Sequence, residues 1–125
     1  WKVIVVGAGD LGRALLRYRG FLRKGFELVC AFDTSPAKVG RSIGALPVRP
    51  IDDLPQVVRE HEVKLAVVAV PAESAQAVAE LLCQAGIQGI LNFAPTRLEL
   101  PAETAVTSVD LAASLEQLAF RISAT

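Results

Sequence analysis

Two patterns of apolar positions alternate along the chain, short continuous runs and segments of helical periodicity. Apolar, mostly β-branched runs predict strands at residues 2–6, 26–32, 46–49, 64–70, 89–93 and 105–109. The run at 64–70 is almost unbroken, so we expect a central strand there, whereas Pro47 favours a strand start or an edge. Apolar residues at helical spacing predict helices from Leu11 to Tyr18, over about 53–61, from about 75 to 85 and at 110–122, and Pro36 and Gly40 predict a short helix between them.

Strands that alternate with helices in this way require right-handed β-α-β crossovers, and these produce a parallel sheet. The sequence therefore predicts an α/β fold with a doubly wound, mostly parallel sheet and helices on both faces. We expect a single domain over residues 1–125, because no repeat or linker divides the chain. The last helix carries an apolar stripe of Leu111, Leu115, Leu118 and Ile122, which predicts burial against another surface.

A glycine-rich motif separates the first predicted strand from the first predicted helix. Its residues are Gly7, Ala8, Gly9, Asp10, Leu11 and Gly12, a G-x-G-x-x-G pattern in the strand-to-helix context of Rossmann-type dinucleotide-binding folds. Gly7 allows a tight turn, Gly9 lets backbone amides approach a diphosphate, and Gly12 allows the helix to pack closely on the strand. We expect the free N–H groups of the helix N-terminus to bind the anion, with Asp10 pointing outward.

Asp33 ends the second predicted strand, 21 residues after Gly12. In this fold a carboxylate at that position accepts hydrogen bonds from the adenosine ribose hydroxyls and repels a 2′-phosphate. Neither Thr34 nor Ser35 supplies an arginine that would bind such a phosphate. The sequence therefore favours NAD(H) over NADP(H), whereas a solvated acidic turn residue is the alternative interpretation of Asp33.

Two further loops follow strands at the carboxyl edge of the predicted sheet, where such folds bind ligands. One contains Val70 and Pro71. The other contains Asn92, Phe93, Ala94 and Pro95. Asn92 either offers its amide to the nicotinamide half of the cofactor or hydrogen-bonds the backbone of the Pro95 turn.

Composition excludes several classes of protein. Thirteen basic and thirteen acidic residues cancel, so this segment lacks the positive field that a run of DNA phosphates would require. No apolar stretch is long enough for a membrane helix and no secretory signal opens the chain, which predicts a cytoplasmic protein without membrane contact. The chain lacks methionine and begins almost on a strand, so we expect it to be part of a longer polypeptide. Cys30 and Cys83 lie in apolar runs without metal-ligand spacing, which predicts reduced thiols.

The chain offers no evident catalytic apparatus. Its one histidine, His61, lies in a charged helix end, where we expect a surface residue rather than an acid or base beside a nicotinamide. No nucleophile motif, metal-ligand cluster or P-loop is present in the sequence. A dinucleotide site without catalytic groups predicts a sensor that is not an enzyme.

The sequence resembles the core domain of the redox-sensing transcriptional repressors of the Rex family along nearly its whole length. The matching segments are 5–21, 25–48, 68–95 and 107–120. The glycine motif alone is common to many folds. More selective are the Tyr-x-Gly-Phe segment 18–21, the Ile-x-Gly-Ile-Leu-Asn-Phe-Ala-Pro segment 87–95 and the Val-Asp-Leu segment 109–111.

This resemblance implies a homodimer whose N-terminal winged-helix domain, absent from this sequence, binds operator DNA. NADH and NAD⁺ would compete for one site, and NADH would close the subunits and release the DNA. By the same resemblance, Gly7–Gly12 would hold the diphosphate and Asp33 with Thr34 the adenosine ribose. Val70, Pro71 and the Asn92–Pro95 loop would contact the nicotinamide end.

The resemblance also assigns a switch and a dimerisation element. Tyr18 and Asp110 would interact in the NADH state, whereas core packing for Tyr18 and helix capping for Asp110 are the alternatives. Leu111 would approach the nicotinamide bound to the partner subunit. Residues 110–125 would form a C-terminal helix that is exchanged in the dimer.

Three other interpretations share parts of this pattern. A CoA-binding Rossmann domain has a similar glycine loop, but in such a domain Asp33 would have a smaller role in ligand binding. An NAD-dependent dehydrogenase fragment would need a catalytic residue in a further domain. A structural Rossmann domain with a degenerate pocket is disfavoured by the intact glycines.

Overall fold

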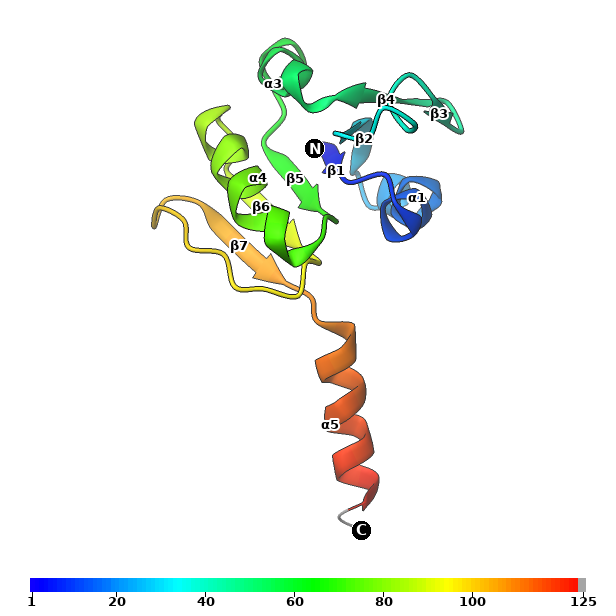
Figure 1. Cartoon of the computed structure of the whole chain (residues 1–125), viewed down its shortest axis with the longest axis vertical. Coiled ribbons are helices and arrows are strands. Elements are labelled where there is room, and N and C mark those ends of the chain that lie inside the picture. Colours follow the sequence, from blue (N-terminus) through cyan, green and yellow to red (C-terminus); the bar gives the residue numbers. More distant parts are fainter. Residues whose placement is uncertain (124–125) are drawn as a thin grey trace.

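A seven-stranded sheet forms the centre of the computed structural model, which describes residues 1–123 (Figure 1). Its strands are β1 Lys2–Val6, β2 Glu27–Asp33, β3 Ser42–Ile43, β4 Leu46–Pro50, β5 Leu65–Val68, β6 Gly89–Asn92 and β7 Ala105–Ser108. They lie in the order β3-β4-β2-β1-β5-β6-β7, and every neighbouring pair is parallel except β3 and β4. The predicted doubly wound, mostly parallel sheet is confirmed, with β5 flanked by β1 and β6.

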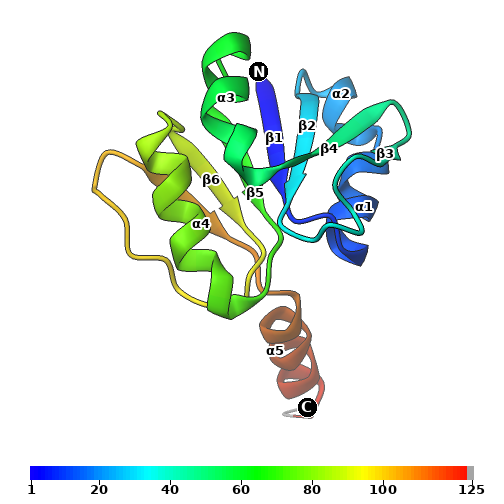
Figure 2. The same ribbon diagram turned by 45° about the horizontal axis from the view of Figure 1, so that its top comes forward.

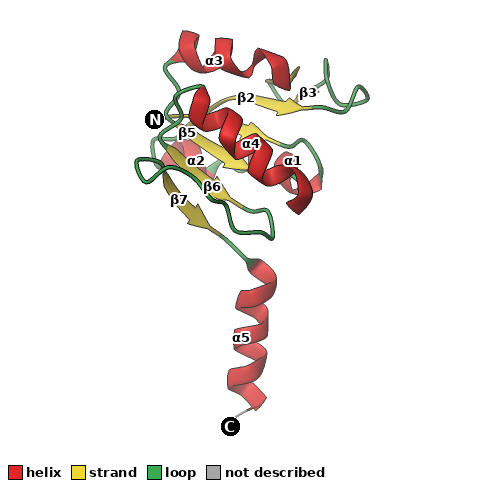
Figure 3. Cartoon of the chain, turned by 60° about the vertical axis from the view of Figure 1, so that its left-hand side comes forward, coloured by secondary structure: helices red, strands yellow, loops and turns green. Residues whose placement is uncertain are grey.

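Helices cover both faces of this sheet. The helices are α1 Asp10–Arg17, α2 Gly20–Arg23, α3 Leu54–His61, α4 Ala72–Gln84 and α5 Leu111–Ser123, and a 3₁₀ turn, Ile51–Asp53, precedes α3. In Figure 3, α4 lies in front of the sheet, α3 lies at the top of the view and α2 lies behind the sheet. The side chains of α3 and α4 form one apolar cluster with one sheet face, and those of α1 form a second cluster with the other.

The larger apolar cluster explains why these helices pack where they do. Phe32 and Ile4 from the sheet, with Leu54 and Leu82 from α3 and α4, are fully buried in it. Each such side chain contributes about 1.5–3 kcal/mol relative to exposure, so this layer holds the sheet and both helices together. Cys30 is also buried there; burial raises the pKa of its thiol to about 11, although Arg49 opposes the shift. Both cysteines are free, as predicted.

Backbone hydrogen bonds extend the sheet past its strand ends at the carboxyl edge. Gly7 N donates to Phe32 O at 2.8 Å, and Ala69 N donates to Val6 O at 2.8 Å. On the next strand, Phe93 N donates to Val68 O at 2.9 Å. The loops after β1, β5 and β6 therefore leave the sheet side by side, and those after β1 and β5 contribute to the site.

The segment 34–40 differs from its prediction. A short helix is wrong here, because residues 36–40 form turns. Gly40 N donates to Val48 O and Val48 N donates to Arg41 O, at 2.9 and 2.8 Å, so β4 takes the backbone groups that a helix would have paired internally. A five-residue segment gains too few helical bonds to offset the cost of nucleation. The sequence also gave no sign of α2 or of the two-residue strand β3.

The last helix extends away from the rest of the molecule (Figures 1 and 2). None of its described residues is buried, and Leu111, Leu115, Leu118, Phe120 and Ile122 are all more than half exposed. The sheet has an uncovered apolar hollow of about 380 Å³ on the α2 face, over β1, β5, β6 and β7. The chain alone therefore leaves both an apolar helix face and an apolar sheet surface exposed to solvent.

Candidate functional site

A crevice of about 520 Å³ opens at the carboxyl edge of the sheet, between the glycine loop, the end of β2 and the start of α4. The predicted site residues that line it are Gly7, Gly9, Asp10, Leu11, Asp33, Thr34, Val70 and Pro71. Lys38, Ile51, Ala69, Ser74 and Val78 line it as well, and the sequence did not single them out. Tertiary structure thus brings the glycine loop and the acidic end of β2 to one concave surface.

The absence of a side chain has a different structural consequence at each of the three motif glycines. Gly7 has a φ of +110°, and a Cβ there would collide with the carbonyl of Ala69. A Cβ on Gly12 would collide with the carbonyl of Gly7, so both residues are required by the fold. Gly9 differs, because it has a φ of −75° and a Cβ there would meet only the Lys38 ammonium, at 3.9 Å. The space above Gly9, meaning the position that a Cβ would occupy, is therefore free of other protein atoms, and Gly9 lines the crevice.

The N-terminus of α1 presents backbone donors at this point. Gly9 is its N-cap residue and provides no side-chain cap, so the first N–H groups of the helix are available to a ligand. An anion placed there also gains from the positive end of the helix dipole. Asp10, in the first turn, is exposed and lines the mouth of the crevice.

Hydrogen bonds fix the Asp33 carboxylate beside the glycine loop, at the wall of the crevice. Its Oδ2 accepts a hydrogen bond from Ala8 N and its Oδ1 accepts one from Ser35 N, each at 2.8 Å. Burial raises the pKa of this carboxyl, but the hydrogen bonds from Ser35 and Ala8 and the charge of Lys38 outweigh it, so the pKa lies below its ordinary value. The side chain is 14% exposed. An ionised carboxylate has about four acceptor positions, so two remain for hydroxyl groups of a ligand.

Lys38 is the cation of the crevice, and sequence reasoning missed it. Its Nζ lies 4.0 Å from Asp33 Oδ2, and its side chain is 45% exposed. The turn at 36–40 places the ammonium between Asp33 and the open space above Gly9. The one available signal was a lysine five residues after the acidic end of a strand, and that signal is weak without the turn geometry.

The loop after β6 has a mainly structural arrangement. The buried side chain of Asn92 donates from Nδ2 to Thr96 O at 3.0 Å and accepts at Oδ1 from Ala94 N at 3.0 Å. Of the two roles considered for Asn92, this geometry is that of the residue that fixes the Pro95 turn. Asn92, Phe93, Ala94 and Pro95 do not line the crevice, and their contact with a cofactor stays a prediction.

Tyr18 and Asp110 lie on separate parts of the structure. Tyr18 follows α1, is 59% exposed and packs edge-to-face on Phe21, with ring centroids 4.9 Å apart, so it is not a core residue. Asp110 Oδ1 accepts a hydrogen bond from Ala113 N at 2.9 Å, which caps α5 as one of the two interpretations proposed. Within residues 1–123, no hydrogen bond joins Tyr18 to Asp110.

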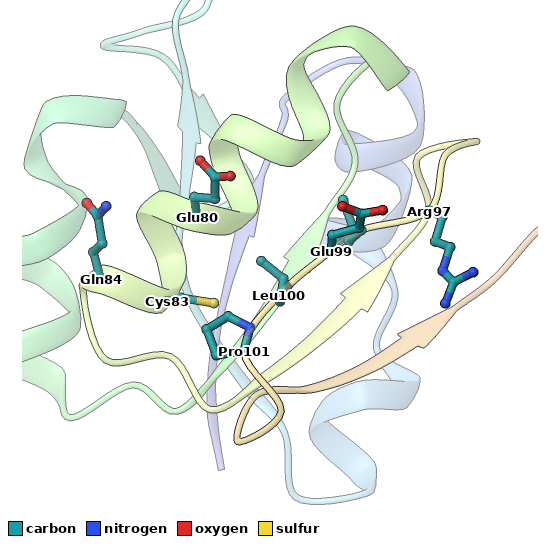
Figure 4. Close-up of a pocket in the computed structure, with 8 residues that line it drawn as sticks. Glu80, Cys83, Gln84, Arg97, Glu99, Leu100 and Pro101 are labelled. Atoms are coloured by element: carbon teal, nitrogen blue, oxygen red, sulfur yellow. The ribbon is translucent and has the colours of Figure 1, made fainter.

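A second hollow, between α4 and the segment 97–101, shares no residue with the crevice (Figure 4). Gln76 on α4 fixes this segment, because its amide donates to Glu99 O at 2.8 Å and accepts from Glu99 N at 2.9 Å. Side chains of both charge signs, including Glu80 and Arg97, line the hollow together with Cys83. Among residues 1–123, no group of three or more His, Cys, Asp or Glu is arranged to hold a metal ion. The described helices also include none with the length and apolar character needed to cross a bilayer.

Comparisons with known proteins agree with this fold. The model of the CoA binding domain family matches residues 1–96. The chain belongs to this family of CoA-binding domains.

Over 98% of its length the domain is 56% identical to the redox-sensing transcriptional repressor Rex of Rhodopirellula baltica, of which it covers 52%. Crystal structures of RSP, a Rex-family repressor, are also similar. RSP with NADH matches 98% of the domain with a TM-score of 0.92 and 30% identity, and the domain covers 59% of that chain. RSP with NAD⁺ and operator DNA matches with a TM-score of 0.93 at 30% identity, and there the domain covers 56%. The resemblance to the Rex core is thereby confirmed, and the domain spans about half the length of these relatives.

Proposed function

We propose that this domain is the NADH- and NAD⁺-sensing core of a redox-responsive transcriptional repressor. The observation that carries the proposal is the crevice in which the unfilled space above Gly9 faces the ionised carboxylate of Asp33. A diphosphate fits the free amides at the start of α1, and ribose hydroxyls fit the remaining acceptor positions of Asp33. Thr34, Val70 and Pro71 would bound the same ligand. NAD⁺ and NADH would compete for this site.

Operator DNA would be bound by a separate N-terminal winged-helix domain in the same cytoplasmic polypeptide. The net charge of zero is consistent with a separate DNA-binding domain, because this domain has no overall positive field to attract DNA phosphates. NADH would release the DNA by favouring one arrangement of two subunits, which needs differential affinity and no bond breaking. His61, at the end of α3, lies outside the crevice, which is consistent with a sensor rather than an enzyme.

The C-terminal segment 110–125 would form the dimer contact. Its exposed apolar stripe and the uncovered apolar hollow on the sheet are the kind of surfaces that a second copy would bury. Exchange of α5 between subunits would bring Leu111 to the nicotinamide end of the partner's site. Tyr18, exposed and fixed by Phe21, and Asp110 would form the NADH-dependent pair once two subunits close.

The family name favours a second candidate, a CoA-binding domain, which would use the same glycine loop for the ADP diphosphate of CoA. Calorimetric titration with NADH, NAD⁺, NADPH and CoA separates the two. We expect NADH to bind at least about tenfold more tightly than NADPH or CoA, since only an unphosphorylated ribose can donate both hydroxyls to Asp33. CoA binding more tightly than NADH would contradict the sensor proposal.

A further inference from the structure

The backbone of Lys38 is held in place by its own turn. Lys38 N and Val39 N both donate to Ser35 O, at 3.0 and 3.1 Å, while Lys38 O accepts from Arg41 N. The turn is tied to the sheet through Gly40 N and Val48 O. The backbone of Lys38 is therefore fixed, and the remaining freedom is that of the side chain alone.

The Lys38 ammonium lies between the two groups that would bind the adenosine diphosphate half of a dinucleotide. It is 4.0 Å from Asp33 Oδ2 and 3.9 Å from the point that a Cβ on Gly9 would occupy. A diphosphate above Gly9 would therefore come within ion-pair distance of Nζ. The same charge faces Asp33, whose ionised form a ribose needs as its acceptor.

Basic side chains cluster near Lys38 although the chain as a whole has no net charge. Lys38 also lines an adjoining hollow of about 170 Å³, shared with Arg13 and Arg17 of α1 and with Arg41. No carboxylate lines that hollow, and within residues 1–123 the three arginines make no ion pair. Lys38 and the three arginines thus place positive charge beside the glycine loop, although Asp33 pairs with Lys38.

We propose that Lys38 binds the adenosine diphosphate half of the cofactor and so sets the total dinucleotide concentration at which the domain is occupied, without setting its preference between NADH and NAD⁺. The inference rests on the proposed function and extends it. The two oxidation states share adenosine, both riboses and the diphosphate, and they differ at the nicotinamide ring. A cation that contacts the shared half stabilises both complexes alike, and a ligand reduced to that half should respond in the same way.

Lys38→Gln tests this role by calorimetry with NADH, NAD⁺ and ADP as separate ligands. We expect all three affinities to fall about tenfold, the effect of one partly exposed charge-assisted hydrogen bond, with factors that agree within about twofold. Lys38→Arg should restore most of the loss. High salt should shrink the difference between wild type and Lys38→Gln, because the contact is electrostatic.

Lys64→Gln is the matched control, because Lys64 is exposed and precedes β5 at the opposite edge of the sheet. It should leave all three affinities unchanged. If the wild-type chain binds NADH and Lys38→Gln leaves ADP binding intact, or alters the response to one oxidation state alone, the role of Lys38 is refuted and the cofactor site stands. A wild-type chain that binds neither NADH nor ADP refutes the proposed function together with this inference.

Discussion

Asp33→Asn removes the charge that is expected to select the cofactor while it preserves the shape of the side chain. The asparagine retains one oxygen for either Ala8 N or Ser35 N and presents an NH₂ group to the other. One backbone amide thus loses its acceptor, and we expect the free energy of unfolding to fall by about 1 kcal/mol. The chain should still fold, since the apolar clusters are untouched.

The effect on binding should be larger and should have opposite signs for two cofactors. Hydrogen bonds from ribose hydroxyls to a carboxylate contribute about 1.5–3 kcal/mol each, and partial exposure favours the lower end, so NADH should bind about ten- to a hundredfold more weakly. NADPH should gain, because its 2′-phosphate no longer faces a carboxylate and Lys38 is released from its ion pair with Asp33. The preference for NADH over NADPH should narrow by at least about tenfold.

Calorimetric or fluorescence titration of both reduced cofactors measures this preference directly. Glu27→Gln is the control, because Glu27 begins the same strand at the opposite edge, is exposed and loses the same charge. It should leave both affinities unchanged. An Asp33→Asn chain with the wild-type ratio of NADH to NADPH affinity would refute the assignment of Asp33 to the ribose.

Three further outcomes are expected. The pKa of Asp33 lies below its ordinary value of 3.8, so the charge of Asp33 stabilises the folded state above that pH. The difference in Tm between wild type and Asp33→Asn should stay constant from neutral pH down to about this value. It should then disappear as the pH falls through the folded-state pKa. Gly9→Ala should weaken NADH binding at least about tenfold with little change in Tm, whereas Gly12→Ala should lower Tm steeply, because its Cβ would collide with the backbone; equal Tm losses would mean that Gly9 is also required by the fold. Leu118→Asp on α5 should weaken self-association by about tenfold or more in sedimentation experiments, since a leucine that becomes buried in a dimer contributes about 1.5–3 kcal/mol. Gln117→Asp should leave self-association unchanged. Equal effects of the two substitutions would argue against α5 as the dimer contact.

The strands, most helices and the core of the site were predictable because their signals are local. Apolar runs of four to seven residues mark β1, β2 and β5 in any context in which both faces of a sheet are covered. The glycine motif constrains the backbone within six residues, and Asp33 follows from its place at the end of the next strand. The alternation of elements then leaves few topologies other than the one observed.

Tertiary structure decided what depends on contacts between distant segments. The segment 36–40 forms a turn instead of the predicted helix because β4 offers backbone partners to Gly40 and Arg41. This turn places Lys38 in the crevice. Asn92 differs, because its amide bonds to Thr96 and Ala94, only four and two residues away, and this turn-fixing role was one of the two that the sequence offered. Local patterns determine which segments form strands and helices, since propensity and periodicity act within a few residues. Side-chain roles depend on which neighbours the fold supplies, and hydrogen-bond partners far away in sequence carry no local signal.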